Sequence, residues 1–512
     1  AVALSDQAAQ DRLAALGYRD PRGAMRHIEA LTNGVSRRAE IQRHLMPVLL
    51  GWFAEGVDAD AGLLGFRLVS ESLGTTSWYL RMLRDSPAAA ERLCQILSSS
   101  RYITDLLEDA PTSITWLDKV ADLQPLSAGA LKAEITSLLS RHDDSADAMR
   151  AVRYLRRREI LRIAMGDALN LLSVQQVCTG LATVDECTIG AALALAEREE
   201  INAGERDEKT TPQKSDAPQR DSQEAAGENP EEEQRNPLLT EITVIAMGRL
   251  GGAENGFGSD ADVMFVHRPV ESADEKEAQA QANRIVNRLM QLIKQPVRPA
   301  IRAERPLEVD ADLRPEGKQG ALVRSLDSYR AYYERWAETW EFQALLRARP
   351  IAGSEELGCA FVELIDPYRY PREFTVEQVQ QVRRMKARVE HERMPHGADR
   401  TRQLKLGRGG LSDVEWLVQL IQLQHAYKVE GLRTTSTLEA LDAAVQANLV
   451  AAEDAEVLRD AWLLATKIRG GNVLRGVRQS DLLPTLRDAL EAVARWSGYT
   501  PGSARQLEED YL

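Results

Sequence analysis

The residues best suited to chemistry lie in one short segment, GSDAD at residues 258–262, which ends a glycine-rich stretch. Glycines permit tight turns and let a phosphate approach the backbone amides closely. The glycines concerned are Gly248, Gly251, Gly252, Gly256 and Gly258. Their spacing matches neither the GxxxxGK[ST] loop nor the dinucleotide-binding GxGxxG pattern, and such loops are often purely structural. The continuation into Ser259, Asp260 and Asp262 favours a functional interpretation.

Acidic residues with a spacing of two follow this turn. On a strand, residues two apart project from the same face, so Asp260 and Asp262 bring two carboxylates together. Such charges repel unless a cation lies between them, and oxygen ligands suit Mg²⁺ or Mn²⁺ better than zinc. A later strand offers Glu308, Asp310 and Asp312 on one face. The sequence therefore predicts a three-carboxylate cluster able to hold two metal ions for an in-line phosphoryl displacement. A DxD pattern by itself is more often a solvated loop, but here both flanking patterns favour the site.

The elements that must position these acids form a small sheet within a helical chain. Short β-branched, apolar runs predict strands at 242–248, 261–268 and 306–313, and the spacing of apolar residues at 278–295 predicts a helix between the last two. Elsewhere apolar residues recur three and four positions apart, which is typical of amphipathic helices. The expected fold class is mainly α with a small mixed β-sheet (α+β).

Composition and periodicity divide the chain into three expected domains. Residues 1–145 form a helical domain, residues 146–372 contain the sheet, and residues 373–512 form a C-terminal helical bundle. Residues 203–237 have almost no large apolar side chain and are expected to be a disordered insertion. The basic run at 156–158 is interpreted as a solvated helix face, with a partner-facing patch as the alternative.

The net charge and the residue counts restrict the functional class of the protein. A net charge of -14 argues against broad capture of nucleic acid, which needs a basic surface. The four cysteines are scattered without metal-ligand spacing, as expected in a reducing cytoplasm. The seven histidines show no metal-ligand spacing either. No apolar run of membrane-spanning length and no signal peptide is recognised, so a cytoplasmic protein without membrane contact is expected. Because the chain begins without Met, it is expected to be a fragment of a longer protein.

Four sequence blocks in the second half resemble a known family. The GSDAD segment with the later acidic strand is similar to the nucleotidyltransferase superfamily of the DNA polymerase β type. The closer resemblance is to the bacterial glutamine-synthetase adenylyltransferases. The blocks are GRLGGAENGFGSDADVMFVH, VDADLRPEGKQGALV, YYERWAETWEFQALLRARPIAG and LKLGRGGLSDVEWLVQ. A weaker likeness extends upstream through the helices, so the resemblance covers essentially the whole chain.

The resemblance implies a fold, a site and a reaction. Residues 146–372 would be a polymerase β-like nucleotidyltransferase catalytic domain flanked by helical domains. Carried over by position, Asp260, Asp262 and Asp310 would bind Mg²⁺, or Mn²⁺, and would be catalytic, whereas Gly258 and Ser259 would contact the phosphates of ATP. The enzyme would transfer AMP from ATP to a tyrosine of glutamine synthetase, release pyrophosphate and so regulate nitrogen assimilation. The resemblance also raises the PII signalling protein and glutamine as regulators.

Several alternatives stay open. Enzymes of this family are bifunctional, with one half that attaches AMP and one that removes it by phosphorolysis. The single GSDAD site indicates one half, and the long preceding helical region favours the transferring half. The removing half, a non-catalytic regulatory module and a small-molecule adenylyltransferase are the alternatives. Asp312 stands where the family usually has arginine or another residue, and it competes with Asp310 as third ligand, although Asp310 is preferred.

Further polar residues lie in the last two blocks. They fit helix caps and surface ion pairs, or contacts to a nucleotide, and the basic turn before residue 411 could hold a phosphate. These residues are Glu341, Arg347, Arg349, Lys405, Arg408, Asp413 and Glu415.

Overall fold

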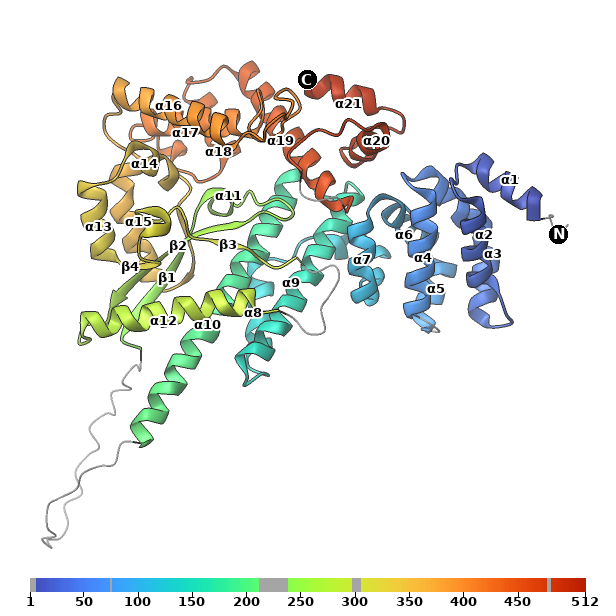
Figure 1. Ribbon diagram of the computed structural model, residues 1–512, viewed down its shortest axis with the longest axis horizontal. Coiled ribbons are helices and arrows are strands. Elements are labelled where there is room, and N and C mark those ends of the chain that lie inside the picture. Colours follow the sequence, from blue (N-terminus) through green and yellow to red (C-terminus); the bar gives the residue numbers. More distant parts are fainter. Residues whose placement is uncertain (1–5, 74–75, 211–237, 297–304, 477–479) are drawn as a thin grey trace, which may run out of the picture.

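The computed structural model describes residues 6–73, 76–210, 238–296, 305–476 and 480–512. Helices dominate these residues, and five strands form a small mixed sheet near the middle of the chain. The predicted fold class is therefore confirmed. Three regions can be followed in Figure 1: a row of N-terminal helices, the sheet with its covering helices, and a C-terminal bundle that lies along one side of both.

The N-terminal region is a series of short helices with polar caps at their starts. The side chains of Ser36, Ser100 and Ser127 each accept a hydrogen bond from the backbone N–H three residues later, which satisfies a donor that the helix leaves free. The helices are α1 (Asp6–Leu16), α2 (Pro21–Thr32), α3 (Arg37–Glu55), α4 (Ala59–Leu73), α5 (Ser77–Asp85), α6 (Pro87–Ser99), α7 (Arg101–Asp109) and α8 (Ala128–Leu139), with two 3₁₀ turns, η1 (Pro111–Leu117) and η2 (Val120–Leu123).

Two long helices join this region to the sheet, α9 (Ser145–Ala168) and α10 (Val174–Thr210). The segment Val174–Gly204 of α10 is long and apolar enough to cross a membrane, yet 72% of its most apolar window is buried within the protein. The sequence analysis missed this segment. Its burial against α9, α12 and the sheet is that of a core helix (Figure 1).

Part of the segment that is expected to be a disordered insertion is helical. Residues 203–210 continue α10, so the expected disorder is wrong for them. A helix that is already nucleated and packed can extend into a polar segment, because each further residue adds a hydrogen bond without a new nucleation cost. Residues 211–237 lie outside the described residues.

The sheet has the strand order β3-β2-β1-β5, with β4 also paired to β2. Strands β1 and β5 are antiparallel to their neighbours, whereas β3 and β4 run parallel to β2, which makes the sheet mixed. The strands are β1 (Thr240–Ala246), β2 (Ala261–Pro269), β3 (Val309–Asp310), β4 (Val323–Ser325) and β5 (Arg349–Gly353). The sequence analysis found β1 and β2 closely, made β3 too long and missed β4 and β5.

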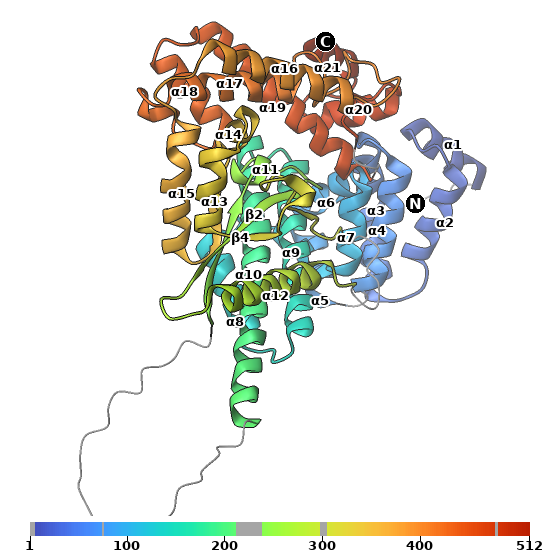
Figure 2. The same cartoon turned by 60° about the vertical axis from the view of Figure 1, so that its left-hand side comes forward.

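Alternation along the strands divides their side chains between two cores. Val263 and Phe265 of β2 join the large core shared with α12, while Met264 and Val266 face the opposite core. That second core contains Tyr329, and its helices cover the other face of the sheet (Figure 2). The helices of this region are α11 (Gly248–Gly251), α12 (Glu275–Lys294), α13 (Leu326–Arg335), α14 (Thr339–Leu345) and α15 (Glu355–Arg369), with the 3₁₀ turn η3 (Gly317–Gln319).

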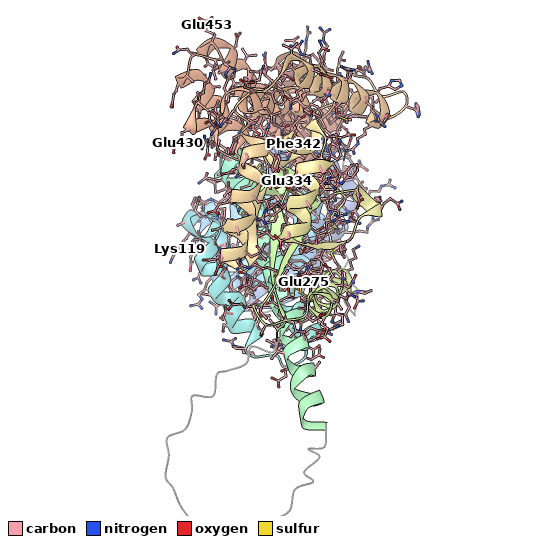
Figure 3. The ribbon with its side chains drawn as sticks, turned by 90° about the vertical axis from the view of Figure 1, so that its left-hand side faces the viewer. Lys119, Glu275, Glu334, Phe342, Glu430 and Glu453 are labelled. Carbon is pink, nitrogen blue, oxygen red and sulfur yellow. The ribbon has the colours of Figure 1, made fainter. Side chains whose placement is uncertain are left out.

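The C-terminal bundle has its own apolar core, built around Trp462 and Leu441. Figure 3 shows it at one end of the molecule, with Glu430 and Glu453 on its surface and Glu275 of α12 near the other end. Its helices are α16 (Val376–Arg393), α17 (Leu411–His425), α18 (Thr437–Gln446), α19 (Ala452–Leu474), α20 (Arg487–Trp496) and α21 (Ala504–Tyr511), with the 3₁₀ turn η4 (Glu430–Leu432). The large core runs without a break from the N-terminal helices into α9, α10 and the sheet, so the boundary near residue 145 stays a prediction.

Candidate active site

The glycine-rich turn after β1 brings the backbone directly against a carboxylate. Gly248 has a φ of +52°, and a Cβ atom at this position would lie 2.3 Å from Oδ2 of Asp262. The backbone N–H of Met247 donates to the carbonyl oxygen of Asp262 at 2.8 Å. Only glycine combines this backbone conformation with so close an approach. The turn therefore fixes the position of Asp262.

Parallel pairing of β2 and β3 juxtaposes two of the three predicted acids. In the register of these strands, Asp262 lies opposite Asp310 and Ala261 lies opposite Val309. The N–H of Ala261 also donates to the carbonyl oxygen of Glu308 at 2.8 Å, which continues the pairing. Asp260 lies just before the start of β2 and is exposed. The structure thus brings these acids to one edge of the sheet beside the glycine-rich turn.

The electrostatics of the acids agree with their proximity. Burial, followed by the charges of Asp310 and Asp260, raises the pKa of Asp262 to about 6. Partial desolvation, followed by the charges of Glu308 and Asp310, raises the pKa of Asp260. The neighbouring carboxylates therefore add to the effect of burial in disfavouring the ionised forms of Asp260 and Asp262.

The donor chemistry of this edge fits a hard divalent cation. Asp260, Asp262 and Asp310 offer oxygen atoms alone, which suits Mg²⁺ or Mn²⁺. Their mutual repulsion, expressed in the raised pKa of Asp262, is what a divalent cation relieves. Within the described residues, no three His, Cys, Asp or Glu side chains are already grouped as a metal site. The carboxylates therefore lie close enough to interact electrostatically, and their joint role as metal ligands stays a prediction.

Gly258 and Ser259 lie in the loop before β2, where Gly258 is exposed and Ser259 is half-buried. Gly258 has a φ of +72°, a conformation that favours glycine. The N–H of Ser259 donates to the carbonyl oxygen of Gly256 at 3.1 Å, and the N–H of Gly256 donates to the Ser259 hydroxyl at 3.0 Å. These bonds shape a compact turn. Contact of both residues with phosphate stays a prediction.

Asp312 differs from the sequence expectation. Glu308, Asp310 and Asp312 were predicted on one face of a strand, but β3 ends at Asp310. The N–H of Asp312 donates to Oδ1 of Asp310 at 2.7 Å, so the chain turns at this point. The Asp312 side chain instead lies 3.2 Å from the Lys318 ammonium group. A local side-chain-to-backbone bond has replaced the expected strand, as short acidic side chains often do.

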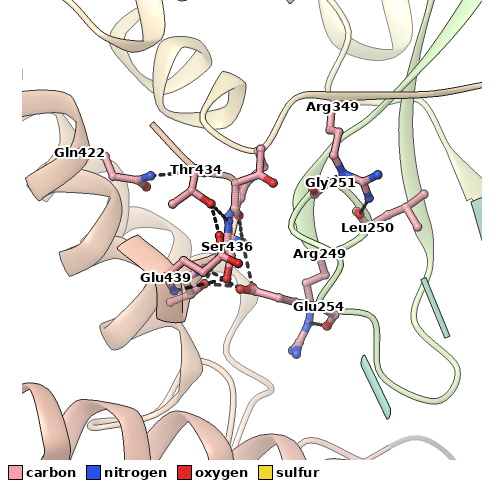
Figure 4. A network of polar contacts seen from close by, with 12 residues as sticks. Arg249, Leu250, Gly251, Glu254, Arg349, Gln422, Thr434, Ser436 and Glu439 are labelled. Atoms are coloured by element: carbon pink, nitrogen blue, oxygen red, sulfur yellow. Dashed lines mark hydrogen bonds and ion pairs between the residues drawn. The ribbon is translucent and has the colours of Figure 1, made fainter. Parts of the chain in front are cut away.

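Two consecutive buried residues that the sequence analysis did not single out hold the glycine-rich loop. The first, Glu254, accepts hydrogen bonds from the N–H of Thr437 at 2.6 Å and from its hydroxyl at 2.9 Å. It also accepts one from Arg347 at 2.8 Å, and Arg347 donates to the carbonyl oxygen of Thr435 at 2.6 Å. Figure 4 shows Glu254 extending from the loop toward the segment that carries Thr434 and Ser436. The loop is therefore fastened to the C-terminal bundle.

The second residue, Asn255, fastens the loop on the opposite side. Its side-chain amide donates to Oδ2 of Asp185 on α10 at 2.9 Å, and Arg156 on α9 donates to the other oxygen of Asp185 at 2.9 Å. Arg349 adds a third support, since it donates to the carbonyl oxygens of Gly251 and Leu250. The interpretation of residues 156–158 as a solvated face is wrong, because Arg156 and Arg158 donate to acids on α10 and α8 and Arg157 is buried.

Most other polar residues of the two downstream blocks have structural contacts. Glu341 accepts from the N–H of Glu338 at 2.8 Å and completes a capping box at the start of α14. Asp413 accepts from the N–H of Gly409 and from Lys386 near the start of α17. Lys405 differs from these, because its positive charge acts on Asp260 and Asp262.

The fold and the site together define a class of protein. It is an α+β protein in which a glycine-rich turn and two parallel strand ends gather carboxylates at one edge of a small mixed sheet between helical regions. The predicted chemistry of such an edge is metal-assisted phosphoryl transfer.

Comparison with known proteins gives the family. The family model described as glutamate-ammonia ligase adenylyltransferase matches residues 90–220 and 214–364, more than half of the chain. The chain belongs to this family. A second model, described as GlnD PII-uridylyltransferase, matches residues 383–512.

Curated relatives agree over nearly the whole chain. Three of them carry the name bifunctional glutamine synthetase adenylyltransferase/adenylyl-removing enzyme. The protein of Leifsonia xyli is 46% identical over 509 residues, which cover 99% of this chain and 46% of that protein. The proteins of Streptomyces avermitilis and Mycobacterium avium are 47% and 42% identical, each over 99% of this chain and 49% and 48% of the relative. The chain spans about half the length of the curated relatives it matches.

Proposed function

We propose that the chain is the adenylyl-transferring half of a glutamine synthetase adenylyltransferase. It transfers AMP from ATP to a tyrosine hydroxyl of glutamine synthetase and releases pyrophosphate. The observation that carries the proposal is the opposition of Asp262 and Asp310 on parallel strands beside the glycine-rich turn. The family membership and the names of the relatives support the reaction and the substrate protein.

The proposed reaction is an in-line displacement at the α-phosphorus of ATP. The tyrosine oxygen forms a bond to this phosphorus, and the bond to the bridging oxygen of the β-phosphate breaks. Pyrophosphate leaves with the bonding electron pair, and the tyrosine proton passes to a nearby base, for which Asp310 is the candidate. Asp260, Asp262 and Asp310 would hold Mg²⁺ or Mn²⁺, and the ion would neutralise charge on the phosphates.

The residues of the chain contribute mainly through position and charge. Gly258 and Ser259 offer a turned backbone at the start of β2 for contact with phosphate. Glu254 and Asn255 hold that backbone between two helical regions, so that reacting groups meet in a fixed geometry. We further propose that the protein acts in the cytoplasm without membrane or nucleic acid, and that the PII signalling protein and glutamine regulate it.

One assay tests the direction of the reaction. Purified chain is incubated with Mg²⁺, glutamine synthetase and ATP labelled at the α-phosphate. Label on the synthetase supports transfer. Release of label from pre-modified synthetase only after addition of phosphate selects the adenylyl-removing half, which the names of the relatives also include. If a folded chain gives neither of these two signals, the explanation is a regulatory module.

The Asp260→Asn variant ties the assay to the site. Because Asp260 is exposed, the substitution leaves the fold intact while it removes one negative oxygen from the metal site. We expect loss of labelling with an unchanged circular dichroism spectrum. Full activity of this variant would overturn the assignment of the site.

A further inference from the structure

Helices α14 and α16 form the two walls of an open groove on the surface (Figure 1). Its volume is about 680 Å³. The hydroxyl of Thr339 on α14 donates to Oε1 of Gln381 on α16 at 2.5 Å, which joins the walls. The lining is part apolar and part charged, with Trp340, Phe342, Met385, Glu338, Arg384 and Arg388 as its main side chains. The groove therefore offers apolar and charged contacts together.

The groove leads toward the carboxylate edge of the sheet. A second hollow of about 910 Å³ shares Trp340, Met385 and Arg388 with it and extends to Leu313. Leu313 follows Asp310 by three positions, and a hydrogen bond of 2.7 Å from the N–H of Asp312 to Asp310 keeps the turn between them tight. Small-molecule sites have volumes of roughly 300–1,000 Å³. The joined hollow is therefore larger than a small ligand needs, and it suits an extended segment of a protein.

Helix α16 and the segment after it are basic, although the protein as a whole is acidic. Residues 372–408 carry ten lysines and arginines against five aspartates and glutamates, whereas the whole chain has a net charge of -14. Of the residues of α16, all of which the structure describes, Val382 alone is buried. The basic side chains of this helix are therefore accessible. A local basic surface attracts an acidic partner that the remaining surface repels.

One cation of the groove is left available by the fold. Arg384 is exposed, and its guanidinium donates to a backbone carbonyl of its own helix at 3.4 Å. Among the described residues, no carboxylate oxygen lies within 4.0 Å of it. The other charged side chains of the groove are engaged: Arg388 pairs with Glu392 at 2.8 Å, and Glu338 accepts from the indole N–H of Trp340 at 3.0 Å. Arg384 can therefore receive a carboxylate from a partner.

The apolar part of the groove indicates a protein as the partner. Trp340, Phe342 and Met385 belong to the residue types that are enriched at protein interfaces. Trp336, immediately before Ala337 of the lining, is 68% exposed, which is unusual for so large an apolar side chain. A nucleic acid would need a basic surface over the whole domain, and the net charge of the chain opposes it. The groove therefore fits a protein segment that combines acidic and apolar side chains.

We propose that the groove between α14 and α16 docks an acidic segment of the substrate protein, the segment that carries the acceptor tyrosine. A carboxylate of this segment pairs with Arg384, its apolar side chains pack against Trp340 and Phe342, and its tyrosine extends past Leu313 toward the carboxylate edge. The inference rests on the proposed function and deepens it, because it names the surface that recognises the substrate protein.

Binding to immobilised glutamine synthetase, measured without ATP, tests this proposal. Arg384→Ala is expected to weaken binding by about fivefold, since one charge-assisted contact is lost. The affinity of this variant should also fall less steeply with added salt than that of the wild type, because fewer charges are screened. In the labelling assay the KM for glutamine synthetase should rise by the same factor, while the KM for ATP stays unchanged. A raised KM for ATP would assign the groove to the nucleotide and overturn the proposal.

A matched control lies on the same helix. Arg383 is the exposed neighbour of Arg384, and it does not line the groove. Arg383→Ala removes the same charge and is expected to leave the affinity for glutamine synthetase within about twofold. Equal effects of the two variants would reduce the role of Arg384 to general electrostatics and overturn the docking site.

Two random copolymers test the acidic chemistry of the docked segment. A copolymer of glutamate and tyrosine should compete with glutamine synthetase for the wild-type chain, and it should compete less well for Arg384→Ala. A copolymer of lysine and tyrosine should not compete. Competition by neither copolymer, or by both equally, would contradict recognition of an acidic segment.

The outcomes also separate this inference from the proposed function. If the wild-type chain labels glutamine synthetase while Arg384→Ala binds and labels it normally, the docking site is wrong and the function stands. If glutamine synthetase binds with the expected variant pattern but no label is transferred or removed, the docking site stands and the function is wrong.

Discussion

Two groups of acids in this molecule, the helix-linking acids and the edge acids, have opposite environments. The helix-linking acids Glu254, Asp185 and Asp167 each meet a basic partner: Arg347, Arg156 and Lys467 respectively. The edge acids Asp260 and Asp262 meet chiefly other carboxylates, and their pKa values are raised by desolvation and by those neighbours. Because an uncompensated charge costs stability, the sheet edge tolerates an arrangement that the helix-linking acids avoid. The difference indicates that the edge acids serve a cation from outside the chain.

The helix-linking acids also explain how the helical regions reach the site. Asp167 accepts from Trp496 at 2.7 Å and from Lys467 at 2.5 Å, which joins α9 to α19 and α20. Glu254 joins the glycine-rich loop to α18, and Asn255 joins the same loop to α10 through Asp185. The loop before the edge acids is thus held from two sides. A displacement of either helical region would therefore shift Asp260 through the short loop that carries Glu254 and Asn255.

Breaking an ion pair of the helix-linking acids is expected to have the largest effect on stability. Glu254→Gln leaves Arg347 buried without a compensating charge, and the loss of one partner of a buried pair costs about 3–5 kcal/mol. The free energy of unfolding from urea titration measures this cost. Arg347→Met in the same chain should recover part of it, because the unpaired charge is then gone. A loss below about 1 kcal/mol would place Glu254 among weakly contributing surface pairs.

Removal of an edge acid is expected to separate activity from stability. Asp262→Asn should reduce AMP transfer by at least about 100-fold, as loss of one charge-stabilising group commonly does. The free energy of unfolding at neutral pH should rise by about 1–2 kcal/mol, because a carboxylate with a raised pKa is destabilising when ionised. Initial rates and urea titration provide the two readouts. If Asp262→Asn were both inactive and unfolded, Asp262 would be required for folding. That result would contradict the contrast between the edge acids and the helix-linking acids.

Glu197, a half-buried acid away from the site, allows the cost of burying a carboxylate to be measured separately. Burial raises the pKa of Glu197 on α10 to about 7. The folded state then holds a proton that the unfolded state has released, so stability falls as pH rises from about 4.5 to 7. Glu197→Gln should remove this part of the pH dependence. At about pH 8 the variant should be more stable by about 2 kcal/mol, and at about pH 4 the two proteins should be alike.

Thermal unfolding across this pH range checks the expectation for Glu197. The difference in melting temperature between variant and wild type should grow steadily as the pH rises. A constant difference at every pH would mean that the substitution acts through packing alone, and that Glu197 is not a titrating group in this range.

The sequence was sufficient for the parts of the site that follow local rules. Short β-branched, apolar runs predicted β1 and β2, and the GSDAD pattern after the glycines indicated which acids would lie at the sheet edge. The opposition of Asp262 and Asp310 followed from adjacent strands, although the parallel register itself is a tertiary property. Short strands such as β4 and β5 carry too few residues for a periodic signal, and a proline such as Pro350 within β5 is uncommon in strands.

The residues that hold the loop could not be found in this way. Glu254 and Asn255 lie in a glycine-rich turn, where polar residues are common and usually solvated. Their partners Thr437 and Asp185 lie far away in the sequence, on different sides of the loop. No local pattern encodes such contacts. The arginines at 156–158 were misread for the same reason, since a basic run on a helix signals solvent unless its acidic partners are known.

The smallest effect is expected at Asp312, and it decides the identity of the third carboxylate. Asp312 lies beyond the end of β3 and pairs with Lys318, whose side chain is 79% exposed. Surface pairs of this kind contribute about 0–1 kcal/mol, so Asp312→Asn should change neither stability by more than that nor the rate of AMP transfer by more than about twofold. Asp310→Asn, two positions earlier, should abolish transfer, because Asp310 alone lies opposite Asp262. If the two variants exchanged these phenotypes, the turn after β3 would have to rearrange in the working enzyme, and Asp312 would join the edge acids.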